Sequence, residues 1–424
     1  MLLLLKKYNI LTFFFFVFVL LAFLAYFWGW KTSGVLENSM SMTYPEGYRY
    51  GFSSLKYGDW WVNKESSYYL LAAQGFLGVD GATLNVGCMY EIYRTFYPLL
   101  LRSFWFLEPI EAVLVLDIFM WFFACTAIWC TCKNIGLSST TSFFAIFLTI
   151  FGQGFLQSVG EGIPHLAGYC SGYFVIFLIS YLRSWEKLAS WKDDIPIYAF
   201  IGIWQLAYGT AFFFLPVALC ATFWRFYQNS FFDLKKLWLL LFLAFMPYLI
   251  ISLCVKIFFS SSGGVSAIVF ENIMKNYQGF YSLVKRYLFV LFDSFVSLGP
   301  VALVGLFGLV YSSFREKNPY LRVLLGVCLL QFLAMAVLLL PLAGRGYATF
   351  NFYPAICLGA AIVLGNLWEQ KGRILKIYVS SFCFLLVIYA HGVKAGFQLP
   401  NQIFFTGVGS INAPWFSHEL ILFQ

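Results

Sequence analysis

The sequence predicts an all-α polytopic membrane protein with about eleven transmembrane helices and a long first external loop that bears amphipathic interfacial helices. Hydrophobic residues make up 61% of the chain, charged residues only 11%, and the mean hydropathy is +0.79. Soluble globular domains carry about 25% charged residues. The charges stand in clusters separated by apolar runs of about 20 residues, which is the length of a helix that crosses a bilayer. Unbroken runs such as Leu11–Tyr26 exclude the alternating strands of a membrane β-barrel.

The apolar runs place the spans in order. The first follows Lys6 and Lys7, and Trp28 and Trp30 stand where a signal peptide would have a small-residue cleavage site, so we expect a retained anchor. The predicted spans are Ile10–Trp30, Ile110–Thr131, Ser139–Phe155, Leu166–Leu182, Ile195–Tyr208, Ala211–Phe226, Leu237–Phe258, Leu288–Val310, Val323–Leu342, Ala348–Leu367 and Ile377–Ala390.

These spans divide the chain into six parts. We expect a first transmembrane anchor (1–30), an external loop (31–108), a transmembrane bundle (109–258), a second external loop (259–286), a C-terminal transmembrane bundle (287–391) and an external tail (392–424). The sequence shows no internal repeat and no pair of helices broken by glycine and proline in corresponding places, which disfavours a secondary transporter.

The charges predict the orientation. Basic residues gather at alternate span ends, on the side that the positive-inside rule makes cytoplasmic. They are Lys6, Lys7, Lys133, Arg183, Lys187, Lys192, Lys235, Lys236, Arg315, Lys317, Arg322, Lys371, Arg373 and Lys376. The opposite side collects the carboxylates of Glu37, Glu46, Asp59, Glu65, Asp80, Glu91, Glu108, Glu161 and Glu271. We therefore expect an integral plasma-membrane protein (in a bacterium, the inner membrane) with a cytoplasmic N-terminus and an external C-terminus.

Composition also excludes several functions. The net charge of +8 comes from basic residues at span ends, so it predicts topology and no nucleic-acid partner. Most of the ten cysteines lie inside predicted spans and only Cys88 lies clearly in an external loop, which excludes a disulfide framework. Three histidines in all make a histidine-rich metal site improbable.

The segment Gly58–Arg102 is polar, aromatic and rich in carboxylates, so it is not a membrane span and is a candidate for a functional site. An amphipathic helix begins near Asn63, with Glu65 in its first turn, where a carboxylate is favoured. A carboxylate fixed at that place can act as a general base that takes the proton of an attacking hydroxyl. The alternative is a charge that only stabilises the start of an interfacial helix.

Three stretches of the chain resemble the GT-C superfamily of integral-membrane glycosyltransferases. The pattern E-x-x-Y-Y-x-x-A-x-x-x-x-x-G from Glu65 resembles their acidic motif, and FYPLLLRSF, Phe96–Phe104, resembles the segment that leads into their second span. RGYATFNFYPAICLGAAIVL, from Arg345, resembles a late span. Protein O-mannosyltransferases, the aminoarabinose transferases of lipid A and the phage-type O-antigen glucosyltransferases are the members that the chain is similar to.

The resemblance implies a GT-C-like fold and an active site on the external, periplasmic face. It implies a polyprenyl-phosphate-linked sugar donor and an acidic base in the first external loop, which falls on Glu65. Many members have an acidic pair there, whereas Lys64 precedes Glu65 here, so Asp59 and Glu37 stay as alternative bases. The acceptor is then a glycan such as O-antigen, a lipid or a protein.

Further polar residues are candidates for the same site. Arg345 and Tyr347 can hold the donor phosphate, because a guanidinium binds phosphate bidentately, and Lys285 and Arg286 can serve the same group. Substrate-lining candidates are Glu161, His165, Trp60, Trp61, Tyr68 and Tyr69, although interfacial aromatic belts use the same residue types.

No cofactor is certain from the sequence, no metal ligands are assigned, and a divalent metal stays open. The predicted partners are the lipid-linked donor, the acceptor and the bilayer. Two rivals from other classes remain: a transporter or flippase of lipid-linked glycans, and a non-catalytic membrane partner. A polymerase or ligase of O-antigen is a closer rival, but its long external loop would come late in the chain.

Overall fold

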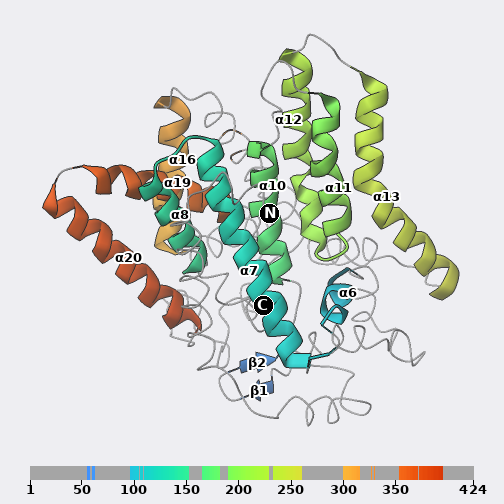
Figure 1. Ribbon diagram of the computed structural model, residues 1–424, viewed down its shortest axis with the longest axis horizontal. Helices are drawn as coiled ribbons and strands as arrows, with labels where there is room; N and C mark the ends of the chain where they lie inside the picture. Colours follow the sequence, from blue (N-terminus) through green and yellow to red (C-terminus); the bar gives the residue numbers. More distant parts are fainter. Residues whose placement is uncertain are drawn as a thin grey trace, which may run out of the picture.

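The fold is a bundle of helices, seen in a computed structural model (Figure 1). The structure describes residues 55–57, 60–62, 96–104, 106–107, 109–151, 165–181, 190–228, 233–259, 299–315, 326, 329, 353–370 and 372–394. The α-helices are α6 (Phe96–Arg102), α7 (Pro109–Asn134), α8 (Ser139–Ile150), α10 (His165–Tyr181), α11 (Ile195–Trp204), α12 (Leu215–Gln228), α13 (Leu234–Phe259), α16 (Pro300–Arg315), α19 (Tyr353–Glu369) and α20 (Arg373–Lys394). The 3-10 helices η1 (Trp191–Asp194) and η2 (Gly209–Phe214) precede α11 and α12.

One small element departs from the all-α prediction. Strands β1 (Leu55–Tyr57) and β2 (Trp60–Val62) pair antiparallel, with Tyr57 opposite Trp60 and Lys56 opposite Trp61. The sequence around them is rich in tryptophan, tyrosine and valine, which favour strands. The segment predicted to be the first external loop therefore contains a hairpin, which precedes the residues predicted to form amphipathic helices. Those residues lie outside the described ranges.

From α7 onward, each described α-helix overlaps a predicted span, but the ends differ, as at α16 (Pro300–Arg315), where Leu288–Val310 was predicted. The predicted spans Ile10–Trp30 and Val323–Leu342 lie outside the described helices. Ala112–Asn134 in α7 and Leu234–Leu253 in α13 are long and apolar enough to cross a membrane. Four other apolar helices are shorter, and α8 has 12 residues, or about 18 Å of helix against a core of about 30 Å. The described part of the chain thus contains two candidate spans by this test, and the predicted eleven are not confirmed.

The helices run alternately between two ends of the bundle. Contacts fix their directions: Cys170 Sγ donates to the Met120 carbonyl at 3.1 Å and Asn134 Nδ2 to Ser180 Oγ at 3.2 Å, so α10 runs parallel to α7. Tyr353 OH, at the start of α19, donates to the Leu148 carbonyl near the end of α8 at 3.0 Å, so these two helices are antiparallel. We call the two ends the Pro109 end and the Lys133 end, after the first residue of α7 and the basic residue in its last turn.

The Lys133 end matches the side that the sequence predicts to be cytoplasmic. It lies at the top of Figure 1, where α12 connects to α13. Its described basic residues are Lys133, Lys192, Lys235, Lys236, Arg315, Arg373 and Lys376. Exposed aromatic side chains accompany them, among them Tyr227 (79% exposed), Trp238 (64%) and Tyr378 (69%). Aromatic and basic residues together at helix ends are typical of a membrane–water interface.

Three of the helical segments that begin at the Lys133 end, α8, η1 and α13, are capped there by side chains. Ser138 Oγ accepts the Thr141 amide proton ahead of α8, and Ser190 forms a reciprocal capping box with Asp193 at η1. Asp233 Oδ1 accepts the amide protons of Lys235 and Lys236 at the start of α13. These caps satisfy backbone donors that a helix start leaves open, and so they fix where each chain segment enters the bundle.

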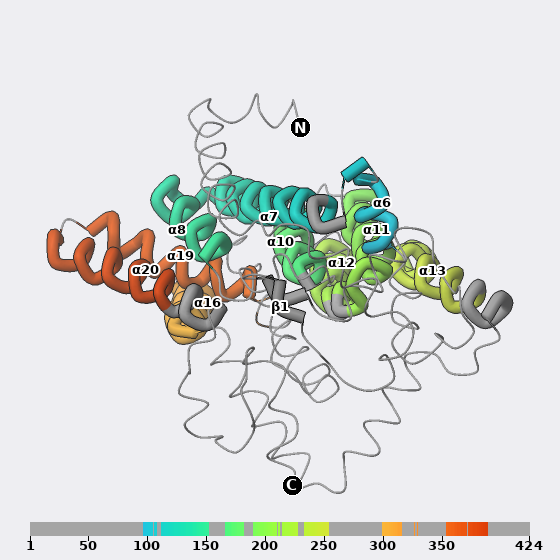
Figure 2. Tube along the Cα trace, turned by 90° about the horizontal axis from the view of Figure 1, so that it is seen from below, coloured from blue at the N-terminus to red at the C-terminus, as the bar shows by residue number. Residues whose placement is uncertain are grey.

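One part of the core centres on α19, which is largely buried and packs against α8 and α16. Small residues let backbones approach closely: a Cβ at Gly308 would overlap the carbonyl of Gly359, and one at Gly305 would overlap the carbonyl of Ile356. Such contacts are a common way for helices to associate in membranes. By contrast, α13 and α20 flank the bundle on opposite sides (Figures 1 and 2) and expose rows of large apolar side chains such as Phe242 and Phe384.

Replacing Gly308 by valine is expected to lower the free energy of unfolding by about 2–3 kcal/mol, because the added side chain must push α16 away from α19. The thermal midpoint of the detergent-purified protein measures the effect. Gly209→Ala is the control, since no atom lies within 4 Å of a Cβ built there. Equal midpoints for the two variants would contradict the close α16–α19 contact.

Candidate functional site

The chain segments that carry the predicted site residues are all joined to the bundle at the Pro109 end. The segment before residue 96 enters at α6, and residues 152–164 lie between the end of α8 and the start of α10. Residues 260–298 lie between the end of α13 and the start of α16, and the segment with Arg345 leads into α19 at Tyr353. Helices far apart in the sequence thus bring these attachment points to one end.

Among the predicted site residues, only three have a described backbone. Trp60 and Trp61 lie in β2, and His165 is the first residue of α10. The other predicted site residues lie outside the described ranges: Glu37, Asp59, Glu65, Tyr68, Tyr69, Glu161, Lys285, Arg286, Arg345 and Tyr347. Their roles stay predictions.

A junction of three consecutive residues organises the Pro109 end. Trp204 ends α11, and its Nε1–H donates to the carbonyl of Ala167 in α10 at 2.7 Å. Gln205 Nε2 donates to the carbonyl of Ala244 in α13 at 2.6 Å. The Leu206 carbonyl accepts the amide proton of Phe96, the first residue of α6, at 3.1 Å. We call Trp204–Leu206 the 204–206 junction, because it binds three separate helices.

Aromatic rings strengthen the same junction. The Trp204 indole stacks on Phe200 with centroids 5.0 Å apart and meets Phe96 edge-on at 5.9 Å. Phe174 of α10 lies against both Phe200 and Trp204. Nearby, the Tyr208 ring lies so close to Gly168 that a Cβ on that glycine would overlap it. The start of α10 is therefore held tightly against the end of α11.

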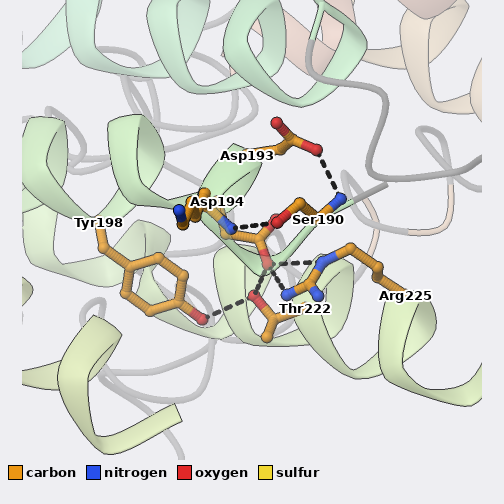
Figure 3. A network of polar contacts seen from close by, with 7 residues as sticks. Ser190, Asp193, Asp194, Tyr198, Thr222 and Arg225 are labelled. Atoms are coloured by element: carbon orange, nitrogen blue, oxygen red, sulfur yellow. Dashed lines mark hydrogen bonds and ion pairs between the residues drawn. The ribbon is translucent and has the colours of Figure 1, made fainter. Parts of the chain in front are cut away.

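A buried ion pair lies toward the other end of the bundle (Figure 3). Arg225 of α12 donates from Nε and Nη2 to Asp194 Oδ2, and the side chains are 3% and 0% exposed. Thr222 Oγ1 donates to the same oxygen at 3.0 Å and lies 3.0 Å from Tyr198 OH. The pair joins the start of α11 to the third turn of α12.

Sequence reasoning missed this pair. Asp194 belongs to the polar run before the predicted fifth span, where it passes for a surface charge, whereas Arg225 falls inside the predicted sixth span. A lone arginine within an apolar run is costly in a membrane unless it has a partner, and that signal could have prompted the search for a carboxylate.

Burial and hydrogen bonding act on two carboxyl groups outside the predicted spans. Burial raises the pKa of Asp194, while the guanidinium of Arg225 and the hydroxyl of Thr222 oppose the rise. At Asp233, the hydrogen bond and charge of Lys236 lower the pKa of a partly exposed carboxyl. Asp194 is thus a charge held inside the protein by its partner, and Asp233 is a surface cap.

One further carboxylate lies within the bundle. Asp117 of α7 is 2% exposed and lies within electrostatic range of Cys170 in α10. Seven cysteines of the described helices, among them Cys125, Cys170 and Cys357, are free thiols. Within the described ranges, no three His, Cys, Asp or Glu side chains gather in a way that could hold a metal ion.

No family model matches the sequence, and no curated protein matches it. Among solved structures, the chain is similar to the Archaeoglobus fulgidus oligosaccharyltransferase AglB in complex with an inhibitory peptide and a dolichol-phosphate (TM-score 0.42, 13% identity, 85% of this chain and 51% of that chain). It is also similar to the Archaeoglobus fulgidus oligosaccharyltransferase tethered with an acceptor peptide (TM-score 0.41, 14% identity, 84% and 48%). The chain spans about half the length of these proteins. A likeness at these TM-scores is too distant to assign a function.

Proposed function

We propose that this chain is a membrane glycosyltransferase that moves a single sugar from a polyprenyl-phosphate carrier to an acceptor outside the cytoplasm. The observation that carries the proposal is the convergence of four chain segments at the Pro109 end, opposite the cluster of basic residues at the Lys133 end. Those segments hold the carboxylates, arginines and aromatic residues that transfer of a sugar from a lipid phosphate requires.

In the proposed reaction, Glu65 accepts the proton of an acceptor hydroxyl while the hydroxyl oxygen bonds to the anomeric carbon. The bond between that carbon and the phosphate oxygen breaks, and the lipid phosphate leaves. Arg345 and Tyr347, with Lys285 and Arg286, bind the phosphate and stabilise the charge that develops on it. Glu161, His165 and the aromatic residues of the first loop contact the sugar or the acceptor.

The proposed acceptor is a bacterial surface glycan such as O-antigen, although a lipid or protein acceptor uses the same chemistry. The proposed location is the plasma membrane, with the N-terminus inside and the active site outside, because the basic residues of the Lys133 end belong on the cytoplasmic side.

Glycan mass and linkage analysis of cells with and without the protein tests this function. The proposal predicts a gain of one hexose-sized unit per glycan or repeat, and Arg345→Ala is expected to lose most of that gain. An unchanged glycan profile in cells supplied with polyprenyl-phosphate donors would overturn the proposal.

A flippase or transporter of lipid-linked glycans is the second candidate. Asp117 favours it, because a carboxylate buried inside a membrane bundle is typical of a substrate or ion pathway. Asp117→Asn separates the two functions. It should abolish translocation of a fluorescent polyprenyl-phosphate sugar by a flippase, and it should leave a glycosyltransferase able to transfer sugar.

A further inference from the structure

We propose that α13 is a hinged helix that bends at Pro247. Its first half is held against α11 by a hydrogen bond from Gln205, and its second half pivots at the proline. The end of α13 at the Pro109 end then moves relative to the rest of the bundle. The inference does not depend on the proposed function, because it concerns the packing of α11 and α13 alone.

The hinge comes from the proline inside α13, four residues after Leu243. Proline has no amide proton, so it cannot make the helical hydrogen bond to the Leu243 carbonyl, and its ring pushes that carbonyl aside. A helix interrupted in this way bends at the proline. The last part of α13 leans away from the other helices (Figure 1). Pro247 is therefore the place at which we expect α13 to pivot.

The end of α11 packs on the backbone of α13 just before the proline. A Cβ at Gly202 would overlap the Leu243 carbonyl oxygen, so this glycine makes room for the carbonyl that Pro247 leaves without its helical donor. Gln205 is 6% exposed, and its Nε2 donates to the Ala244 carbonyl at 2.6 Å and to the Gly202 carbonyl at 3.1 Å. In membrane bundles, neighbouring helices supply such contacts where a proline interrupts a helix. We call the hydrogen bond from Gln205 to Ala244 the clasp.

The two halves of α13 differ in how they are packed. Before the proline, the side chains of Leu240 and Ala244 are 0% exposed. After it, none of the described side chains, residues 248–253, is buried, and Leu249 and Leu253 are 54% and 58% exposed. The clasp therefore lies where the packed half ends, and the second half has few contacts that would resist a tilt.

The second half is long enough for a small tilt to matter. It comprises residues 248–259, which is about 18 Å of helix, so a tilt of about 10° moves its end by about 3 Å. It ends at the Pro109 end, because α13 begins with Lys235 and Lys236 at the Lys133 end. The motion thus changes the distance between α13 and the bundle at the Pro109 end and leaves the Lys133 end unchanged.

Distances between two spin labels test the hinge in the full-length protein in nanodiscs. The labels are attached to a non-canonical amino acid, so that the native cysteines stay in place. One label replaces Phe119 of α7, which is 48% exposed, as the reference. The other replaces either Phe242, 54% exposed before the proline, or Leu253 after it. Pulsed electron paramagnetic resonance gives the distribution of distances for each pair.

We expect the wild-type distribution for the labels at 119 and 253 to be at least about twice as wide as that for 119 and 242. Pro247→Ala restores the helical donor, so it should narrow the 119–253 distribution to about the width of the other. Gln205→Leu keeps the side-chain volume and removes the clasp, so it should about double the width of the 119–242 distribution. Pro216→Ala is the control, because Pro216 lies in the first turn of α12, where a proline is tolerated.

Equal widths for the two wild-type pairs would overturn the hinge. A wide 119–253 distribution that persists in Pro247→Ala would show unwinding of the helix end instead of bending at the proline, and would also overturn it. An unchanged 119–242 distribution in Gln205→Leu would overturn the clasp. The thermal midpoint confirms that each variant is folded. If Gln205→Leu does not fold, Gln205→Asn takes its place, since its amide is one carbon too short to reach Ala244.

Discussion

Replacing Glu65 by glutamine is expected to lower the initial rate of sugar transfer by at least about 100-fold, because the amide cannot accept the proton of the attacking hydroxyl. The substitution keeps the size and shape of the side chain, so the amount of folded protein and its thermal midpoint should not change. The measurement is the rate of transfer from a polyprenyl-phosphate sugar, at matched protein levels in membranes.

Glu369→Gln is the matched control for this prediction. Glu369 is an exposed carboxylate at the end of α19, at the Lys133 end of the bundle, so the variant removes the same charge far from the proposed site. A full rate for Glu65→Gln, with a loss in Asp59→Asn or Glu37→Gln instead, would keep the enzyme class and move the base to one of those carboxylates.

Replacing Arg225 by methionine is expected to lower the free energy of unfolding by about 3–5 kcal/mol. In the variant, the buried Asp194 carboxylate loses both hydrogen bonds that the Arg225 guanidinium donates to Oδ2. The other carboxylate oxygen, Asp194 Oδ1, has no hydrogen-bond partner in the structure. A buried charge without its partner is among the most destabilising changes that a single substitution can make. The thermal midpoint in detergent and the yield of folded protein measure the effect.

A second variant separates the loss of the partner from the loss of packing. Asp194→Leu combined with Arg225→Met removes both charges, so most of the lost stability should return. Lys192→Met is the control, because Lys192 is an exposed cation on the same 3-10 turn as Asp194. If the double variant is no more stable than Arg225→Met, the ion pair is not the cause of the loss.

The sequence alone was enough to locate most helices of the described part of the chain. The predicted span Leu166–Leu182 corresponds to α10, His165–Tyr181, and Leu237–Phe258 corresponds to α13, Leu234–Phe259. Apolar runs bounded by charged clusters predict helices well in a membrane protein, because every backbone group in lipid must be paired within its own segment.

Helix ends and partners were harder to predict. α8 ends at Ile150 rather than at Phe155, and the hairpin of β1 and β2 was not predicted at all. The α16–α19 contact depends on glycines that lie 51 residues apart, such as Gly308 and Gly359, and no local pattern pairs them. Which helices pack against each other is set by the tertiary fold, so this contact could not be predicted from the local sequence.

The candidate site was predictable only in part. Its residue types came from the sequence, and the structure adds the convergence of their chain segments at the Pro109 end. The junction around Trp204 could not be predicted, because its hydrogen bonds go to the backbone carbonyls of Ala167 and Ala244. Every residue has a backbone carbonyl, so the sequence does not show which carbonyl accepts a side-chain hydrogen bond. Only the structure identifies these acceptors.

The most direct test of the central claim is transfer of a radiolabelled sugar from its polyprenyl phosphate, supplied to sealed right-side-out membrane vesicles that contain the wild-type protein. We expect label to appear on the acceptor glycan without opening the vesicles, and to be absent with Glu65→Gln. No transfer in either intact or opened vesicles would contradict a glycosyltransferase, and transfer only in opened vesicles would contradict an external active site.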